Sequence, residues 1–569
     1  MMDIKDKIDA AAGRTPADTL FCNGHMINVF TGEINKQDFA VKDGYICGFG
    51  RYKAEETIDL SGFYVSPGFV DAHVHIESAM VTPAAFARGV VAKGTTTIVA
   101  DPHEIANVLG IKGVEYMLSS AEHQLMNICF AMPSCVPATS METAGAVLDP
   151  VKTAAMLVKD EIIALAEMMN YPGVIYTDAD VMEKIRVAGR QKKRVDGHAP
   201  GLSGKYLHAY VSAGILSDHE CTSTHEALEK LRLGMHIMIR EGTCARNLAD
   251  LLPAVNDHTW RRMMWCTDDR HPEDIIEQGH IDHIVRQAVN SGIDPVRAIQ
   301  MATINPADYF GLIDIGAIAP GRRADFVLFR DLYDICLEQV FALGRVAGQS
   351  GQYLGEITNS ALDCPGAMNL DIKEIDLTIP FKSSRVQVIK ALENQVLTDC
   401  FTADAIEKKG EAVSDPNRDI LKIAVIERYS GRSGTGKGFV NGLGLKKGAV
   451  ASSVAHDSHN IITAGTNDKD MLRAVREVAE MKGGFAVALD NRITASLALP
   501  VAGLMSEHSL ETVNQSMKHL VSAANALGSP LKDIFMTLGF LALPVIPKLK
   551  ITDKGLVDVE KFAMTDLFV

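Results

Sequence analysis

Short apolar runs with turn residues between them open the chain and predict a small antiparallel β unit. Residues 18–62 contain four such runs, at 19–22, 25–30, 39–42 and 45–49. The dipeptides Asn23-Gly24 and Asp43-Gly44 separate them. Both dipeptides favour β-hairpin turns, because Asn, Asp and Gly tolerate positive φ. No motif that carries chemistry falls in this region.

From residue 64 to about residue 311 the pattern changes to apolar or β-branched runs that alternate with amphipathic stretches. Eight runs of this kind begin at residues 64, 95, 127, 162, 194, 216, 236 and 263. Amphipathic stretches such as 84–93 and 225–233 predict helices between them. Eight strand–helix units in about 250 residues are typical of a TIM-like (β/α)8 barrel, whose functional residues lie at the C-terminal strand ends. A doubly wound sheet is the alternative, but it needs neither eight units nor so many polar strand ends.

The remaining segments predict two further units of an α/β protein. Residues 316–329 return to short strands and 340–354 continue them, so this later segment would complete the small β domain around an inserted barrel. A mixed α/β pattern with its own apolar positions begins near residue 371. The expected organisation is a β-sandwich-like domain from 1–62 and 316–370, a metal-dependent barrel over 63–315, and a C-terminal α/β domain over 371–569.

Composition narrows the functional class. A chain of 569 residues exceeds what one hydrophobic core organises, and a net charge of −15 disfavours a nucleic-acid-binding surface. The ten cysteines are scattered and never form Cys-x-x-Cys, which favours reduced thiols in the cytoplasm. The N-terminus lacks the apolar core of a signal peptide. The longest apolar run, 534–546, is shorter than the roughly 20 residues that span a bilayer, so we expect no membrane segment.

Polar residues with metal-binding side chains fall at the predicted C-terminal ends of the barrel strands. His73 and His75 are two residues apart on one strand, so their side chains point to the same face. A lone His-x-His pair is as readily explained by packing and strand capping. The others are Asp101, His103 and Glu104 after the second strand, Glu167 on the fourth, His198 on the fifth, His219 on the sixth, and Asp268 and Asp269 on the eighth. Their coincidence with strand ends predicts one metal centre at the barrel mouth.

This constellation suits two divalent ions that share a hydroxide, which makes a strong nucleophile near neutral pH. Glu167 is the candidate bridging carboxylate and therefore part of the catalytic machinery. His73, His75 and Asp268 would hold one ion, and His198 and His219 the other. Asp268 would also accept the proton of the hydroxide and pass it to the leaving group.

Two motifs in the C-terminal region invite a functional interpretation. Residues 431–437 imitate a phosphate-binding loop, but Gly438 stands where the Mg²⁺-binding hydroxyl should be, so we expect an ordinary turn. The polar segments 456–460 and 466–468 could contribute to a metal or active site, or could form a hydrogen-bonded turn and a helix cap. The second interpretation is favoured.

Several motifs together resemble the amidohydrolase superfamily, a group of metal-dependent hydrolases, and within it the bacterial adenine deaminase family. They are 67–75, 101–107, 165–173, 196–200, 217–220, 265–272, 303–307, 320–325, 456–460 and 540–548, so the resemblance covers nearly the whole chain. Glu167 matches the glutamate that replaces the carboxylated lysine common elsewhere in the superfamily.

The resemblance implies a cytoplasmic, manganese- or iron-activated enzyme of purine salvage that converts adenine and water to hypoxanthine and ammonia. It also implies a homo-oligomer, such as a dimer, that binds neither nucleic acid nor membrane. The Thr-Asp order favours Asp268 over Asp269 as the ligand, while His103, Glu104 and Asp269 are candidates for substrate binding. The alternatives are an amidohydrolase acting on a cyclic amide or N-acetyl substrate, and a non-catalytic scaffold, which should have lost a ligand.

Overall fold

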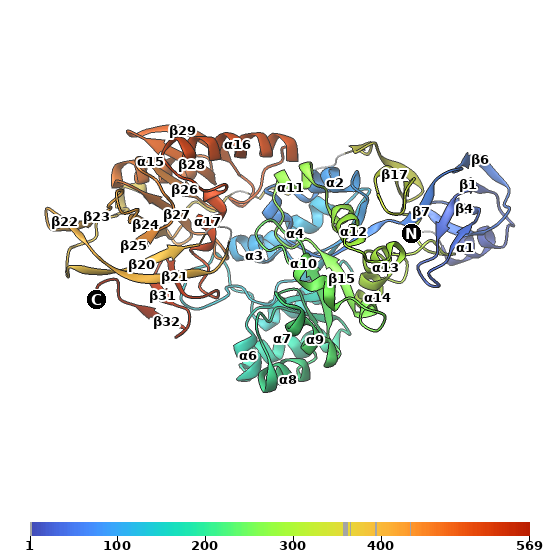
Figure 1. Cartoon of the computed structure of the whole chain (residues 1–569), viewed down its shortest axis with the longest axis horizontal. Helices are drawn as coiled ribbons and strands as arrows, with labels where there is room; N and C mark the ends of the chain where they lie inside the picture. Colours follow the sequence, from blue (N-terminus) through green and yellow to red (C-terminus); the bar gives the residue numbers. More distant parts are fainter. Residues whose placement is uncertain (1–2, 357–361, 365, 393–394, 433) are drawn as a thin grey trace.

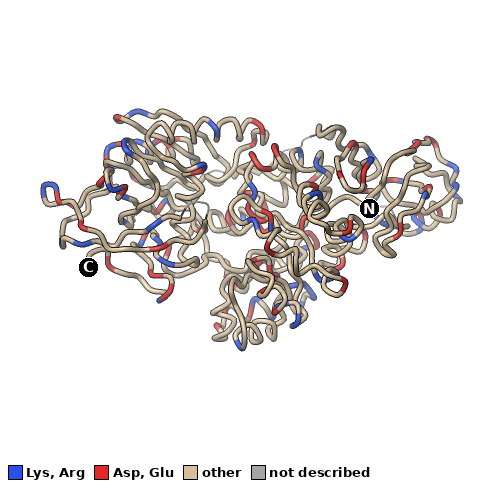
Figure 2. Tube along the Cα trace, viewed as in Figure 1, with Lys and Arg blue, Asp and Glu red and all other residues tan. Residues whose placement is uncertain are grey.

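The computed structural model describes residues 3–356, 362–364, 366–392, 395–432 and 434–569. The N-terminal β strands lie at one end, the barrel segment in the middle and the C-terminal region at the other end (Figure 1). Along the described trace, Lys and Arg positions are interspersed with Asp and Glu positions in this view (Figure 2). Among the described residues, no helix has the length and apolar character to cross a bilayer.

Eight parallel strands form the middle of the molecule, which confirms the predicted barrel. Five of them pair in one sheet: β8 (Phe69–Val74), β9 (Thr95–Ala100), β10 (Asn127–Met132), β11 (Ile162–Met168) and β12 (Arg194–Gly197). The other three are β13 (Ser217–Asp218), β14 (His236–Arg240) and β15 (Met263–Cys266). A parallel bridge between Val74 and Asp268 joins the first and last strands. All eight strands therefore end at one mouth.

Helices between the strands cover the barrel, as the amphipathic stretches predict. Helix α2 (Pro83–Val91) follows the first strand and α9 (Thr224–Arg232) follows the sixth. Apolar residues recur three and four positions apart in these helices, so they share one helix face, and that face packs inward. Phe86 and Ala227 are fully buried in this way.

Strands from both sides of the barrel segment share one sheet. In this seven-stranded sheet, β7 (Tyr64–Pro67) lies between β2 (His25–Ile27) and β16 (Phe326–Phe329). Aromatic rings from both segments also pack together, because the ring centroids of Phe21 and Phe326 are 5.1 Å apart and those of Phe326 and Phe341 are 4.4 Å apart. Strand pairing and aromatic packing thus join residues about 300 positions apart in sequence.

The two predicted hairpin dipeptides differ in their outcome. Asp43 and Gly44 have φ values of 48° and 81° and connect β4 (Phe39–Lys42) to β5 (Tyr45–Phe49), which pair antiparallel as predicted. Asn23 also has positive φ, but it connects β1 (Ala17–Cys22) to β2, and these strands belong to different sheets. The hairpin prediction at Asn23 is wrong because the turn passes the chain from one sheet to the other.

The C-terminal region contains an eight-stranded sheet and three longer helices. In sheet order its strands are β21 (Thr398–Asp404), β20 (Arg385–Ala391), β25 (Thr435–Asn441), β24 (Leu421–Ile426), β27 (Ile461–Gly465), β26 (Ala449–Ser452), β28 (Gly484–Leu489) and β29 (Arg492–Ala498). The helices are α15 (Asp468–Glu480), α16 (Leu510–Ala526) and α17 (Ile534–Phe540). Residues 435–437 enter strand β25 rather than a phosphate-binding loop that opens a helix. All ten cysteines are described and free.

Candidate metal centre

Two histidines at the end of the first barrel strand face each other. His73 lies in β8 and His75 follows it, and their Nε2 atoms are 3.2 Å apart. The Nδ1 atom of His75 donates to the carbonyl oxygen of Asp101 at 3.0 Å, and Nδ1 of His73 lies 3.3 Å from Oδ2 of Asp196. Such contacts on the far ring nitrogen are typical of metal-binding histidines, because they fix the ring and leave the other nitrogen free.

Glu167, near the end of β11, lies between two pairs of histidines. Its Oε1 atom is 3.4 Å from Nε2 of His75 and 3.9 Å from Nε2 of His73. Its Oε2 atom is 2.6 Å from Nδ1 of His198 and 3.3 Å from Nε2 of His219. Burial raises the pKa of this carboxyl, but the imidazoles of His198 and His219 hold it well below its ordinary value. Each carboxylate oxygen therefore faces a separate pair of imidazoles.

Asp268 joins this group from the last barrel strand. Its Oδ1 atom lies 3.0 Å from Nε2 of His75 and 3.7 Å from Nε2 of His73. Its backbone φ is +55°, a region that residues other than glycine rarely adopt and that is enriched at functional sites. The adjacent Asp269 accepts a hydrogen bond from the hydroxyl of Ser78 instead. Of the two aspartates, Asp268 is the one that faces the histidine pair.

A buried arginine that the sequence analysis did not single out contacts the same aspartate. Nη1 of Arg240 donates to Oδ2 of Asp268 at 2.7 Å, and Nη2 donates to Oε2 of Glu220 at 3.0 Å. Burial raises the pKa of Asp268, but the charge of Arg240 holds that pKa well below its ordinary value. The sequence does contain a signal that could have identified Arg240, because this residue is a charged one at the end of the apolar strand 236–240.

The candidate substrate-binding residues lie beside this group. Nδ1 of His103 is 3.2 Å from Oδ2 of Asp101 and 3.5 Å from Oε1 of Glu167. Oε1 of Glu104 is 2.8 Å from Nδ1 of His456, which comes from the C-terminal region. Burial lowers the pKa of His456, but the negative charge of Glu104 raises it to about 9. Glu104 and His456 therefore form a buried ion pair between the barrel and the C-terminal region.

The segment 456–460 is both a turn and part of this cavity. The backbone N–H of His459 donates to the carbonyl of Ala455, which closes the predicted turn. The prediction that the segment serves only as a turn is wrong, because His456 and Asp457 line the cavity. The helix cap predicted in 466–468 is confirmed, since the Asn467 side chain accepts a backbone N–H from the first turn of α15.

The cavity at the barrel mouth has a volume of about 80 Å³. Its polar lining contains five of the six predicted metal ligands and all three candidate substrate-binding residues: His75, Glu167, His198, His219, Asp268, His103, Glu104 and Asp269. The sixth predicted ligand, His73, lies beneath them, 2% exposed.

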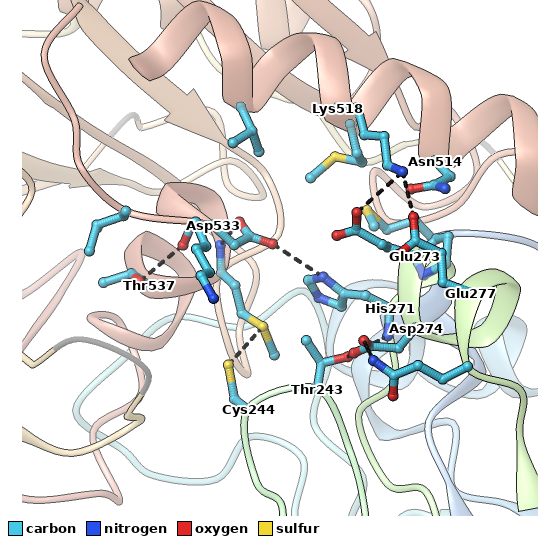
Figure 3. A pocket seen from close by; sticks show the side chains of 18 of the residues that line it. Thr243, Cys244, His271, Glu273, Asp274, Glu277, Asn514, Lys518, Asp533 and Thr537 are labelled. Carbon is cyan, nitrogen blue, oxygen red and sulfur yellow. Dashed lines mark hydrogen bonds and ion pairs between the residues drawn. The ribbon is translucent and has the colours of Figure 1, made fainter. Parts of the chain in front are cut away.

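A groove of about 980 Å³ lies next to this cavity, between α11 (Pro272–Glu277) and the helices α16 and α17. Figure 3 shows His271 directed toward Asp533 across the groove, and Lys518 directed toward the glutamates of α11. The distance from Nδ1 of His271 to Oδ2 of Asp533 is 3.2 Å. The groove and the cavity share Cys244 and Phe540 as lining residues. The two hollows are therefore neighbours, with the groove on the side where the barrel meets the C-terminal region.

Several overlapping sets of buried or half-buried side chains could hold a cation, since their ligand atoms lie within 4.8 Å of one another. These sets are His73–His75–Asp268, His73–Glu167–His219, His198–His219–Glu220, His75–Asp101–His103–Glu167 and Glu104–His456–His459. The first three fit the predicted ligands and bring in Glu220, which the sequence analysis left unassigned. Imidazole nitrogens combined with carboxylate oxygens suit Mn, Fe or Zn ions.

Comparison with known proteins identifies two matching families. Residues 64–348 match the amidohydrolase family, and residues 395–563 match the adenine deaminase C-terminal domain. Among solved structures, a β-aspartyl dipeptidase from Fervidobacterium islandicum AW-1 is similar with a TM-score of 0.45 and 17% identity, over 59% of this chain and 98% of that one.

Curated relatives match over their full length. An adenine deaminase from Desulfatibacillum aliphaticivorans is 51% identical over 99% of this chain and 100% of the relative. An adenine deaminase from Methanothrix thermoacetophila is 46% identical over 100% of both chains. With this identity along its whole length, the chain belongs to the adenine deaminase family of the amidohydrolases.

Proposed function

We propose that this protein catalyses the hydrolytic deamination of adenine to hypoxanthine and ammonia at a binuclear metal centre. The observation that carries the proposal is the position of Glu167, whose two carboxylate oxygens face separate histidine pairs. A carboxylate in that position can bridge two cations. The family membership supports adenine as the substrate.

Six side chains would hold the two ions. His73, His75 and Asp268 would bind one, His198 and His219 the other, and Glu167 both. Mn²⁺ or Fe²⁺ fits this mixed set of nitrogen and oxygen donors. Two such ions supply Lewis acidity and lower the pKa of water, so that hydroxide is available near neutral pH.

The protein's own groups would orient the substrate and move the protons. Asp268 lies on the reactive side of the cavity, where it would take the proton of the attacking water and deliver it to the departing amine. Arg240 would hold this carboxylate in place through its 2.7 Å hydrogen bond. Phe540 and Leu543, from the C-terminal region, line the cavity and would exclude bulk water.

Carboxylates would position the base. Glu104 and Asp269 line the cavity together with His103, and oxygen acceptors suit the amino group of adenine. The cavity's many carboxylates favour a ligand rich in N–H donors over an anionic one.

The test is ammonia release from adenine by protein prepared with Mn²⁺ under iron-depleted conditions. Adenosine, cytosine and dihydroorotate are assayed in parallel, and Glu167→Gln is the inactive control. We expect turnover of adenine alone, reduced at least about 1000-fold in the variant.

Two bound metals without adenine turnover would contradict the substrate and leave another amidohydrolase activity. Absence of both metal and turnover would contradict the enzyme assignment. The dimeric state and the cytoplasmic location stay predictions, which light scattering and cell fractionation can test.

A further inference from the structure

One carboxylate oxygen in the cavity has no hydrogen-bonding partner. Asp457 is 3% exposed and lines the cavity, yet its Oδ2 atom accepts no hydrogen bond from any of the described residues. The other oxygen, Oδ1, lies 3.8 Å from Nε2 of His103. Buried carboxylates almost always accept hydrogen bonds, because leaving one unpaired is costly. Because Asp457 lines the cavity, a bound ligand can supply the missing hydrogen-bond donor.

The neighbouring carboxylates differ from Asp457 because each already has a partner within the protein. Glu104 pairs with His456 at 2.8 Å, and Glu220 accepts a hydrogen bond from Arg240 at 3.0 Å. Of these three carboxylates, Asp457 is the one that has an oxygen without a hydrogen-bonding partner among the described residues.

The position of Asp457 relative to the metal ligands also matters. The ring of His103 lies between them, with Nδ1 3.5 Å from Oε1 of Glu167 and Nε2 3.8 Å from Oδ1 of Asp457. Asp457 and Glu167 thus lie on opposite sides of the His103 ring. In the 9H form of adenine, the exocyclic amine and the ring N–H of the five-membered ring likewise lie at opposite ends of the base.

Cavity size restricts the ligand as well. Its volume of about 80 Å³ is far below the roughly 300 Å³ of ordinary ligand pockets. Apolar side chains enclose it, including Val396, Leu543 and Ile546. A small flat base suits this space, whereas a sugar substituent would have to extend into the groove of Figure 3.

We infer that Asp457 accepts a hydrogen bond from the ring N–H of the five-membered ring of adenine, and thereby selects the free base. This inference rests on the proposed adenine deamination. A nucleoside or N-alkylated purine has carbon in place of that proton and would leave the buried carboxylate unpaired. Sites built to receive a substrate N–H reject analogues that lack it by factors of about 10⁴ to 10⁵.

The experiment compares kcat/KM for adenine, 7-methyladenine and 9-methyladenine in the Mn²⁺ enzyme, in Asp457→Ala and in Leu543→Ala. We expect the wild type to prefer adenine by at least about 1000-fold. Asp457→Ala should lose at least about 100-fold on adenine, and its preference over the methylated bases should fall below about tenfold. Leu543→Ala also enlarges the cavity but keeps the carboxylate, so it should retain the preference.

Inhibition of the wild type by hypoxanthine and by 9-methylhypoxanthine provides a measurement that needs no variant. We expect at least about 100-fold stronger inhibition by hypoxanthine. Equal inhibition, or an Asp457→Ala enzyme that keeps its preference for adenine, would overturn the role of Asp457 alone. If the wild type does not turn over adenine, the proposed function is overturned and this inference with it.

Discussion

Arg240 donates a hydrogen bond to Oδ2 of Asp268 at 2.7 Å, while the other carboxylate oxygen of Asp268 lies 3.0 Å from Nε2 of His75. One carboxylate is thus held between a permanent cation and a histidine that is proposed to bind metal. The contact also joins neighbouring strands, since Arg240 ends β14 and Asp268 follows β15. This arrangement fixes the orientation of the group that would carry the proton.

Replacing Arg240 with Met should therefore impair both stability and turnover. The change leaves Glu220 and Asp268 buried without their cation, which costs about 3–5 kcal/mol of unfolding free energy. We expect a lower Tm by thermal scanning and a fall of about 100-fold in kcat for adenine, because Asp268 loses its fixed position.

The matched control is Arg186→Met. Arg186 pairs with Glu183 on the exposed side of a barrel helix, and its side chain is 59% exposed. Exposed pairs contribute little, so Tm and kcat should stay close to wild type. Equal behaviour of the two variants would contradict a positioning role for Arg240.

His198→Asn and His103→Asn should separate a metal ligand from a substrate contact. Nδ1 of His198 is 2.6 Å from Oε2 of Glu167, so its loss should lower bound metal from about two ions per chain to about one. His103→Asn should keep about two ions and raise KM for adenine about tenfold or more. Elemental analysis after gel filtration, combined with kinetics, gives both quantities.

A different ligand set would produce the opposite result. His103 also belongs to a cluster with His75, Asp101 and Glu167 whose ligand atoms lie within 4.8 Å. If His103→Asn loses one ion while His198→Asn keeps both, that cluster holds a cation and the proposed assignment is wrong.

Removal of metal should abolish activity and lower thermal stability together. Six side chains, five of them buried, are proposed to hold the ions, and an ion that binds only the folded state stabilises that state. At Mn²⁺ concentrations 100 times the dissociation constant, this amounts to about 2.7 kcal/mol. Chelator should lower Tm and stop ammonia release, and added Mn²⁺ should restore both. A chelated enzyme with unchanged Tm and turnover would exclude metal dependence.

Lys550 should make stability depend on pH in the alkaline range. Its side chain is fully buried and donates to the carbonyls of Val396 and Phe540 at 2.8 and 2.9 Å. Burial lowers its pKa from 10.5 to about 7. Between about pH 7 and pH 10.5 the unfolded chain therefore binds more protons than the folded chain, so stability rises with pH across that window. Below about pH 7 Lys550 is protonated in both the folded and the unfolded chain, so it no longer makes stability change with pH.

The Tm of Lys550→Met measured from pH 6.5 to 10 tests this relationship. The variant lacks the titrating group. The Tm of the variant minus the Tm of the wild type should therefore be highest near pH 6.5 and should fall toward pH 10. The full effect is at most about 5 kcal/mol. Lys561→Met, at an exposed lysine ion-paired with Asp558, is the control and should follow the wild type. A constant difference between Lys550→Met and wild type would contradict the expected titration.

The sequence alone determined the barrel and most of the residues at its mouth. Strand periodicity is local, because alternate residues share one face, so His73 and His75 could be placed on the same side of their strand. Because parallel barrel strands end at one mouth, the sequence also predicted that Glu167, His198 and Asp268 lie close together. Those inferences needed only the order of the strands.

Contacts across the fold were decided by the tertiary structure. Arg240 reaches Asp268 because neighbouring strands bring their ends together, and His456 meets Glu104 across more than 300 residues of sequence. Asn23 forms a turn without a hairpin because β1 and β2 pair with strands of two different sheets. Hydrophobic periodicity records which face of an element is buried, but it does not record which distant element covers that face. Packing alone therefore determined the role of Asp457 as a cavity wall, since its neighbours come from the barrel as well as from its own region.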